Sequence, residues 1–306
     1  ISEVLIKNKK KIFIIDNLST GYRSLINKKT KFFKVDILKT KKVREIIIKN
    51  KIDSVIHLAA NLIIGEGEKY PKKYFKNNVI GTKNLLKSCE KTGVKNLVFS
   101  STAAVYKDGQ YKVHENSIIK PKSVYGKTKI KAEKIIKQFF KRNKINYCIL
   151  RYFNIAGSSP SGKIGLINKS DHLFKNFSRE IIKKRPILKI YGGNYDTKDG
   201  SCIRDFIHVS DIAEIHYKVL EKINKLNNSQ ILNCGYNKGI SVLEVAKVFK
   251  NQSSKKVEIL ISKRRKGDLV KIIASNKKLK KFIKWKPKFN NLNTIVKSCI
   301  NWEKRQ

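Results

Sequence analysis

Short apolar runs that alternate with helical stretches are the feature of this sequence that most restricts its fold. Five runs rich in β-branched and aromatic residues lie at 11–16, 31–36, 54–60, 96–101 and 146–153. Helical patterns occupy the segments near 40–50, 72–92 and 124–142. Strands that alternate with helices and are apolar along most of their length form a parallel sheet covered on both faces. We therefore predict an α/β fold with a doubly wound, Rossmann-type sheet over residues 1–154.

Polar residues follow the apolar runs, at points where a parallel sheet carries its chemistry. Ligands of doubly wound sheets bind outside the carboxyl ends of the strands. The residues expected at those ends are Asp16, Asp36, His57–Ala60, Ser100–Thr102 and Arg151–Asn154. We therefore expect a candidate site along this edge.

The start of the chain lacks an element that a nucleotide-binding sheet usually has. Such a sheet opens with a strand, a glycine-rich turn and a helix whose N-terminus holds a pyrophosphate. Residues 1–9 have the pattern of the end of that helix, with no strand or glycine turn before them. Asp16 lies where a ribose-binding aspartate would follow the turn. We therefore expect a sheet without its first strand, weak dinucleotide binding, and little or no activity from the chain as it stands.

The strand–helix rhythm becomes looser in residues 155–306. Loops rich in Gly, Ser and Asp occur at 159–165 and 191–201. Helical patterns cover 172–185, 210–226, 241–250 and 291–305. We expect a smaller α/β domain over 155–306 that binds the substrate, with some exchange of chain between the two domains.

The strongly basic composition raises nucleic acid as an alternative partner. The chain has 69 Lys and Arg against 23 Asp and Glu, a formal charge of +46. However, the lysines are spread over the whole chain, and arginine, the better reader of bases, is scarce. The lysines also accompany many isoleucines and asparagines, as in an A/T-rich gene. We expect salt-sensitive adhesion to polyanions but no specific nucleic acid.

The five cysteines are scattered, without a C-x-x-C motif or a nearby cluster of histidines. They are Cys89, Cys148, Cys202, Cys234 and Cys299. Free thiols in a reducing cytoplasm are the simplest interpretation, and we expect no metal site. No apolar run approaches the roughly 18 residues that a membrane helix needs, so we expect no membrane association.

The segment SVYGKTK, residues 123–129, holds Tyr125 and Lys129 four residues apart. Residues i and i+4 of a helix share a face, so both side chains can reach one site. The pair alone decides little, because many solvent-exposed helices carry the same spacing. Its place about 24 residues after the strand end Ser100–Thr102 makes it informative.

Eight motifs, taken in chain order, resemble those of one known family. They are DNLSTG (16–21), VIHLAA (55–60), NNVIGT (77–82), FSSTAAVY (99–106), SVYGKTK (123–129), RYFNIAGSSPSG (151–162), YDTKDGSCIRDFIHVSD (195–211) and RRKGD (264–268). With them the chain resembles the extended short-chain dehydrogenase/reductase family, and within it the UDP-glucose 4-epimerases. The resemblance runs over nearly the whole chain, and the RYFN and RDFIHV segments are its most specific parts.

The resemblance implies an isomerase of galactose metabolism that uses NAD. It would epimerise C4 of a UDP-hexose reversibly, between UDP-glucose and UDP-galactose, through a transient 4-keto sugar and NADH. Tyr125 would deprotonate the 4-hydroxyl group, Lys129 would be its charge partner, and Thr102 would relay the proton. A phenol with a pKa of about 10 is a weak base at neutral pH. The Lys129 ammonium and the positive nicotinamide ring would together have to lower that pKa by roughly 3 units.

The resemblance also assigns roles to further residues. The residues implied for NAD are Asp16 and Asn17 at the adenosine ribose, Asp36 and Ile37 at the adenine, Leu58, Ala59 and Ala60 at the phosphates and ribose, and Asn78, Ser100, Tyr125, Lys129 and Phe153 at the nicotinamide. The residues implied for the substrate are Thr102 at the 4-oxygen, Asn154, Arg204 and Arg265 at the diphosphate, Leu173 and Tyr191 at the uracil, Asp268 at the uridine ribose and Ile272 beside C2 of the sugar.

Each of these residues also has a plain structural interpretation. Leu58, Ala59 and Phe153 could be apolar core, Asp36 a helix cap, and Arg204 the partner of its neighbour Asp205 in a surface ion pair. Ile272 could likewise face the core. The structure is needed to separate these interpretations.

Two departures and several alternatives stay open. Leu62 replaces a lysine, and His172 replaces an asparagine that often contacts the substrate. The small residues after Thr102 disfavour dehydratases, which place acidic groups there. The substrate could be UDP-N-acetylglucosamine or another UDP-sugar, and a tyrosine at position 272 would exclude the former. A non-catalytic NAD-sensing regulator would be expected to lose Tyr125 or Lys129. The family is often dimeric, so we expect a homodimer.

Overall fold

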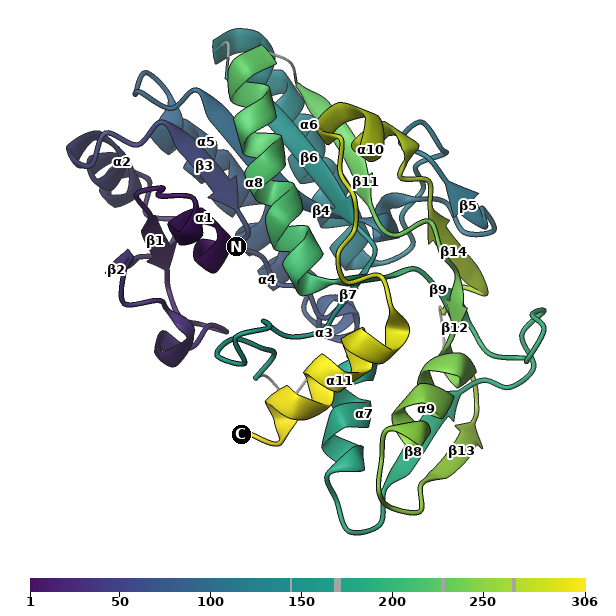
Figure 1. Cartoon of the computed structure of the whole chain (residues 1–306). Coiled ribbons are helices and arrows are strands. Elements are labelled where there is room, and N and C mark those ends of the chain that lie inside the picture. Colours follow the sequence, from purple (N-terminus) through teal and green to yellow (C-terminus); the bar gives the residue numbers. More distant parts are fainter. Residues whose placement is uncertain (144, 168–171, 227–228, 266–267) are drawn as a thin grey trace. The chain divides into compact units, whose positions relative to one another are not determined.

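The computed structural model describes residues 1–143, 145–167, 172–226, 229–265 and 268–306 (Figure 1). The chain forms two compact units. Unit 1 comprises Ile1–Tyr106, Ile119–Tyr152 and Ala213–Leu232, and unit 2 comprises Lys107–Ile118, Phe153–Ile212 and Asn233–Gln306. The chain thus enters unit 2 for 107–118, returns to unit 1, passes to unit 2 again after Tyr152 and returns to unit 1 for 213–232.

The central sheet of unit 1 has four strands in the order β11-β6-β4-β3. They are β3 (Ser54–His57), β4 (Asn96–Thr102), β6 (Asn146–Tyr152) and β11 (Gln230–Cys234). β3 and β6 both run parallel to β4. Helices α5 (Gly81–Cys89) and α6 (Val124–Asn143) cover one face, and α8 (Val209–Leu226) lies over the other (Figure 1). This arrangement confirms the predicted parallel sheet with helices on both faces.

A second, two-stranded sheet of unit 1 carries the first two predicted strands. β1 (Phe13–Asp16) pairs in parallel with β2 (Lys31–Lys34). Helices α1 (Ser2–Lys7) and α2 (Thr40–Lys49) accompany it. The predicted second strand was longer, to residue 36, but the Asp36 carboxylate accepts a hydrogen bond from the amide of Leu38, two residues on, so the chain turns there.

The helix expected over 72–92 is built from three segments. α4 (Pro71–Phe75) runs into a π-turn, η2 (Lys76–Ile80), and then into α5. It follows a short helix, α3 (Ile64–Lys69), that the sequence did not indicate. π-turns are rare and often lie at functional sites, and Asn78 lies within this one.

In the part of unit 2 that the structure describes, the strands form three small sheets. β8 (Ile187–Tyr191) pairs in parallel with β13 (Glu258–Ser262), and β7 (Asn154–Ala156) with β10 (Phe206–His208). The third sheet has the order β12-β9-β14-β5. Its strands are β5 (Lys112–Val113), β9 (Ile203–Arg204), β12 (Ile240–Ser241) and β14 (Lys271–Ala274).

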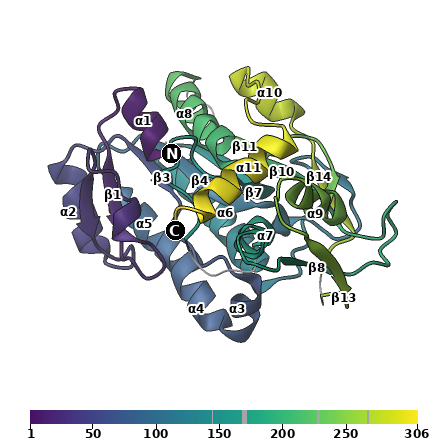
Figure 2. The ribbon, with the colours of Figure 1, turned by 60° about the horizontal axis from the view of Figure 1, so that its bottom comes forward.

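Three amphipathic helices of unit 2 pack into one core. They are α7 (Leu173–Ile181), α9 (Val242–Asn251) and α11 (Leu292–Glu303) (Figure 2). Phe174, Phe177 and Phe249 meet edge to face in this core, where aromatic rings pack favourably. A shorter helix, α10 (Lys277–Ile283), follows β14. Within the described ranges, no helix is long and apolar enough to cross a membrane.

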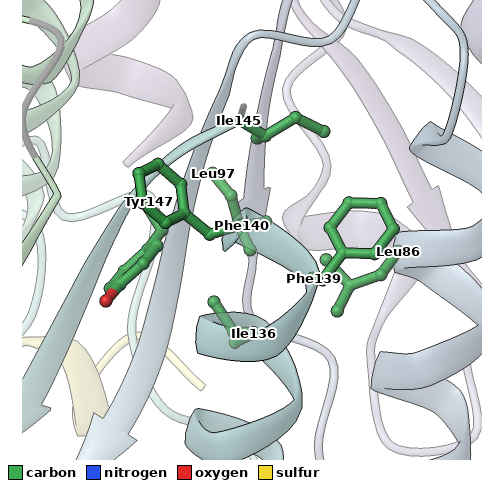
Figure 3. A pocket seen from close by; sticks show the side chains of 7 residues that line it. All are labelled: Leu86, Leu97, Ile136, Phe139, Phe140, Ile145 and Tyr147. Carbon is green, nitrogen blue, oxygen red and sulfur yellow. The ribbon is translucent and has the colours of Figure 1, made fainter. Parts of the chain in front are cut away.

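The core of unit 1 lies between α6 and the sheet and leaves one small apolar void. Its volume is about 10 Å³. It is lined by Leu86, Leu97, Ile136, Phe139, Phe140, Ile145 and Tyr147 (Figure 3). The phenol oxygen of Tyr147 points away from the other six side chains (Figure 3). This void is a packing defect of the core and offers no group for chemistry.

Replacing Ile136 beside this void should destabilise unit 1. Ile136 is 1% exposed. Ile136→Ala enlarges an existing void, so we expect a loss of about 2–5 kcal/mol in the free energy of unfolding. Denaturant titration measures it. The control is Ile48→Ala on α2, because Ile48 is 54% exposed and should cost little. Similar losses in both variants would contradict the packing of α6 described here.

Candidate active site

The predicted catalytic tyrosine lies at the start of α6, beside the end of β4. α6 begins at Val124, and β4 ends at Thr102. The Thr102 hydroxyl lies close enough to the Tyr125 phenol to lower its pKa, and it accepts a hydrogen bond from the amide of Ala104 at 3.1 Å. The structure therefore brings Thr102 and Tyr125 together as the sequence predicts.

Gly126 sets how closely α6 approaches this strand end. A Cβ atom on Gly126 would lie 2.4 Å from the carbonyl oxygen of Ala104, which is backbone and cannot move aside easily. A glycine is therefore required directly after Tyr125, and the start of the helix rests on the turn η3 (Ala103–Val105). This contact fixes how far Tyr125 lies from the end of β4.

Lys129 lies one turn further along α6 and is 3% exposed. Its ammonium donates a hydrogen bond of 2.7 Å to the carbonyl oxygen of Ser100. It lies 4.8 Å from the centre of the Phe99 ring and 5.9 Å from the centre of the Tyr125 ring. The predicted pair thus faces one site, with the lysine anchored to β4.

Burial dominates the electrostatics of this pair. It raises the pKa of Tyr125 to about 12, against the hydrogen bond with Thr102, which lowers it. It lowers the pKa of Lys129 to about 7, against the charge of Glu133, which raises it. The resemblance implies instead that the pKa of the Tyr125 phenol is lowered. In these surroundings the desolvation of the phenolate raises the pKa of Tyr125 more than the nearby groups lower it. Activation of Tyr125 therefore needs further positive charge.

Asn78 and Ser100 hold the parts of this site in place. The amide nitrogen of Asn78 donates to the Asn61 carbonyl at 2.9 Å and to the Thr128 hydroxyl at 3.1 Å, and its amide oxygen accepts from the Asn61 amide at 2.8 Å. The Ser100 hydroxyl donates to the His57 carbonyl at 3.1 Å. Asn78 therefore ties the segment after β3 to α6.

The two predicted aspartates meet at the ends of β1 and β2. The amide of Asn17 donates to the Asp36 carboxylate at 2.9 Å, and the amide of Leu18 donates to the Asp16 carboxylate at 2.7 Å. Asp36 does not cap α2, because the N-cap is Lys39. Ile37 is buried and packs close to Gly81 of α5. These carboxylates and the amide form one polar cluster, suited to the hydroxyl and amino groups of a nucleoside.

The apolar residues after β3 are not core. Leu58 is 46% exposed, Ala59 is exposed and Ala60 is half-buried. Leu62 is 63% exposed. Exposed apolar side chains at a strand end, in the same unit as the aspartate cluster, fit a ligand that is partly apolar and partly polar. The residues present therefore fit a dinucleotide such as NAD.

In unit 2, the structure pairs four of the predicted substrate residues. The Arg204 guanidinium lies 3.6 Å from the Asp268 carboxylate. The Arg265 guanidinium lies 3.9 Å from the centre of the Tyr191 ring. Arg204 does not pair with Asp205, which is buried and bound to backbone amides. Lys266 and Gly267 of the same motif lie outside the described residues.

The other predicted residues of unit 2 differ in exposure. Asn154 is exposed on β7, and Leu173 is half-buried at the start of α7. Phe153 and Ile272 are 6% and 5% exposed, so each packs in the core of this unit. The Nε2 of His172 donates a hydrogen bond of 2.6 Å to the Ile155 carbonyl, and its Nδ1 is buried without a partner among the described residues.

Two buried carboxylates, Glu133 and Asp205, were not predicted from the sequence. Glu133 and Arg151 form an ion pair of 2.8 Å beneath Lys129 in unit 1. Asp205 accepts backbone hydrogen bonds from Tyr236, Asn237 and Ala274 in unit 2. The signal for Glu133 was its i+4 spacing from Lys129, which places it on the same helix face.

A parallel sheet with helices on both faces, carrying a half-buried tyrosine and a buried lysine of a Tyr-x-x-x-Lys pair beside a strand-end hydroxyl, defines a nucleotide-dependent oxidoreductase-type site. The model of the NAD dependent epimerase/dehydratase family matches residues 1–235, and the chain belongs to this family.

Known proteins of the same kind resemble the chain over nearly its full length. It is 38% identical over 302 residues to the UDP-glucose 4-epimerase of Halalkalibacterium halodurans, which covers 98% of the chain and 90% of that relative. The structure of the Bifidobacterium longum UDP-glucose 4-epimerase in complex with NAD+ and UDP aligns with a TM-score of 0.91 at 28% identity, over 99% of this chain and 93% of that one. The UDP-Glc/GlcNAc 4-epimerase of Campylobacter jejuni aligns with a TM-score of 0.85 at 35% identity, over 100% and 95%.

Proposed function

We propose that this chain catalyses the reversible C4 epimerisation of a UDP-hexose, between UDP-glucose and UDP-galactose, with NAD as its cofactor. The observation that carries the proposal is the set of Thr102, Tyr125 and Lys129 at the end of β4, in which the first two are half-buried and Lys129 is buried and bound to the Ser100 carbonyl. The relatives named UDP-glucose 4-epimerase support the substrate class.

The residues of unit 1 would hold NAD and move the proton. Asp16, Asn17 and Asp36 would bind the adenosine part, and Lys129 the nicotinamide ribose. When bound, NAD supplies the hydride acceptor for C4 and a positively charged ring. Tyr125 would accept the proton of the 4-hydroxyl group at its phenol oxygen, with Thr102 as the relay. Positive charge beside the phenol opposes the effect of burial on its pKa, so the base forms only in the loaded site.

The residues of unit 2 would bind the UDP part of the substrate. The guanidinium groups of Arg204 and Arg265 suit the diphosphate, because arginine offers a planar fork of donors. Arg265 already stacks on Tyr191, so the uracil would pack against the remaining surface of that ring. Asp268, which pairs with Arg204, would accept from the uridine ribose.

The decisive test follows the hydrogen at C4. UDP-galactose deuterated at C4 is incubated with the protein and NAD, and the products are separated and examined by mass spectrometry. We expect UDP-glucose that retains the deuterium, because the hydride is returned within the site. Interconversion of the sugars with loss of the deuterium to solvent would reject the proposal.

Gly126→Ala should strongly reduce this activity. The added Cβ atom clashes with the Ala104 carbonyl and pushes the first turn of α6, and with it Tyr125, away from Thr102. A displacement of about 1 Å can cost roughly 100-fold in rate, so we expect a loss of kcat of that order. The control is Gly65→Ala, where a Cβ atom meets nothing within 4 Å. Equal activity of the two variants would show that α6 tolerates the shift.

The structure also bears on the choice of sugar. We expect the chain to accept UDP-N-acetylglucosamine, and the Campylobacter jejuni relative is named for both sugars. Ile272 lies directly opposite Arg204 in the pair of β14 and β9. Ile272→Tyr adds volume there and should lower kcat/KM for the N-acetylated sugar more than for UDP-glucose. Because Ile272 is buried, a stability loss of about 1–3 kcal/mol is expected as well. Equal losses of kcat/KM on both sugars would place Ile272 in the core alone.

A homodimer is a further part of the proposal, and a cytoplasmic location stays a prediction. Exposed apolar side chains gather on α3, α4 and the π-turn and support an interface there. They are Ile64, Tyr70, Phe75 and Ile80, between 37% and 52% exposed. Sedimentation of wild type and Tyr70→Glu would test the dimer; unchanged monomers in both would exclude it.

A further inference from the structure

The buried ion pair beneath Lys129 bears on catalysis as well as on folding. The Glu133 and Arg151 side chains are 0% and 3% exposed. Arg151 binds the carboxylate with two parallel hydrogen bonds, from Nε at 3.0 Å and from Nη2 at 2.8 Å. The Ser101 hydroxyl donates a third at 2.6 Å, and the Tyr106 hydroxyl binds the other arm of Arg151 at 3.1 Å. Such a bidentate geometry holds the carboxylate in one orientation.

β4 fixes Lys129 and Glu133 through successive residues. The carbonyl of Ser100 accepts from the Lys129 ammonium, and the hydroxyl of the next residue, Ser101, donates to Glu133. Glu133 follows Lys129 by four residues on α6, so the two side chains lie on one helix face. The ammonium and the carboxylate are thus held against the same strand.

A buried ammonium at this place needs a negative charge. The groups around Lys129 are the Phe99 ring and Ser100 carbonyl on β4, Tyr125 on its own helix and His57 on β3. Burial, and then the charge of Lys129, lower the pKa of His57 to about 3, so that ring is neutral. Among the described residues, Glu133 is the carboxylate that acts on Lys129.

The far side of the ion pair faces other cations. Glu133 and Arg151 line a cavity of about 380 Å³ together with Lys134 and Lys137 of the same helix. Against the burial of Lys129, the negative charge of Glu133 favours the ammonium form.

We propose that Glu133, clamped by Arg151 and Ser101, is a positioning residue that keeps the Lys129 ammonium charged beside Tyr125. The proposal rests on the proposed function, since Lys129 is given its role there. Glu133 acts through Lys129 and touches neither substrate nor cofactor. Its loss should turn Lys129 into a neutral amine at working pH and leave the Tyr125 phenolate without its partner.

The test measures the ionisation of Lys129 directly, without turnover. The chain is labelled with ¹³C at the lysine ε carbons, and the Lys129 signal is assigned by its loss in Lys129→Met. We expect the titration midpoint to fall by about 1 pH unit or more in Glu133→Gln, the size of effect of a nearby opposite charge. The matched control is Glu45→Gln, an exposed carboxylate on α2, which should leave the midpoint within about 0.3 units.

A second variant guards against a failure to fold, because Glu133→Gln leaves the Arg151 charge buried and unpaired. Glu133→Gln combined with Arg151→Gln removes both charges and should show a smaller fall of the midpoint. A wild-type midpoint in the double variant, or in the folded single variant, would overturn the proposal. In turnover assays of Glu133→Gln, the alkaline limb of the plot of activity against pH should move to lower pH, together with the titration midpoint of Lys129. The reason is that activity is lost as the Lys129 ammonium deprotonates. Absence of turnover in wild type with a shifted midpoint would count against the proposed function only.

Discussion

Tyr125→Phe should lower kcat for UDP-galactose epimerisation by about 10²–10⁴-fold, the usual contribution of a positioned general base. The substitution removes the phenol oxygen that lies near the Thr102 hydroxyl and leaves the ring on α6. Because the ring packing survives, UDP and NAD binding should change little. Steady-state kinetics and calorimetric titration with UDP separate the two effects.

The controls for this variant use residues of matched chemistry. Tyr111→Phe removes the oxygen of a tyrosine that is 48% exposed and should be silent. Thr102→Ala should have a smaller effect than Tyr125→Phe. The double variant should lose less than the product of the two effects, because both groups act on one proton. Half of the wild-type activity in Tyr125→Phe would refute the assignment of the base.

Asp205→Ala should destabilise unit 2 by about 4 kcal/mol, because several buried backbone donors lose their acceptor at once and each costs about 1–3 kcal/mol. The donors are the amides of Tyr236 at 2.8 Å, Asn237 at 2.9 Å and Ala274 at 3.1 Å, with a further bond from Lys238. Thermal and denaturant unfolding measure the loss.

Two variants control for the loss of the carboxylate itself. Asp205→Asn keeps one carbonyl oxygen and should lose only part of the stability. Asp196→Ala removes an exposed aspartate and should lie within about 0.5 kcal/mol of wild type. An Asp205→Ala variant as stable as Asp196→Ala would show that these amides find other acceptors.

The elements that the sequence predicted well are those whose signal is local. The run at 96–101 became β4, buried along nearly its whole length, and the pattern at 124–142 became α6. Thr102, Tyr125 and Lys129 were assigned through the resemblance, whose motifs at the strand end and at the start of the helix are local in the sequence, and the structure places Lys129 against that strand end. β8 and β13 were missed, since their pairing joins Ile187 to Glu258, far apart in the chain.

The charged groups under the site were harder to predict for a physical reason. Glu133 and Arg151 are charged residues that the fold buries completely, and composition alone places such residues on the surface. Their burial becomes plausible only once the helix and the strand are known to be in contact. The same holds for the pKa of Tyr125, because desolvation depends on every group that surrounds the phenol.

The π-turn of unit 1 fixes the angular phase between α4 and α5. A π-turn contains one residue more than an α-helical turn, and one residue corresponds to a rotation of about 100°. Leu85 and Leu86 on α5 face the core in the phase that this extra residue sets, while Tyr74 on α4 is fully buried. Deleting one residue between Lys76 and Ile80 would keep both helices but turn one against the other. Tyr74 and the two leucines could then not be buried at the same time. Asn78 would also lose its hydrogen bonds to Asn61 and Thr128.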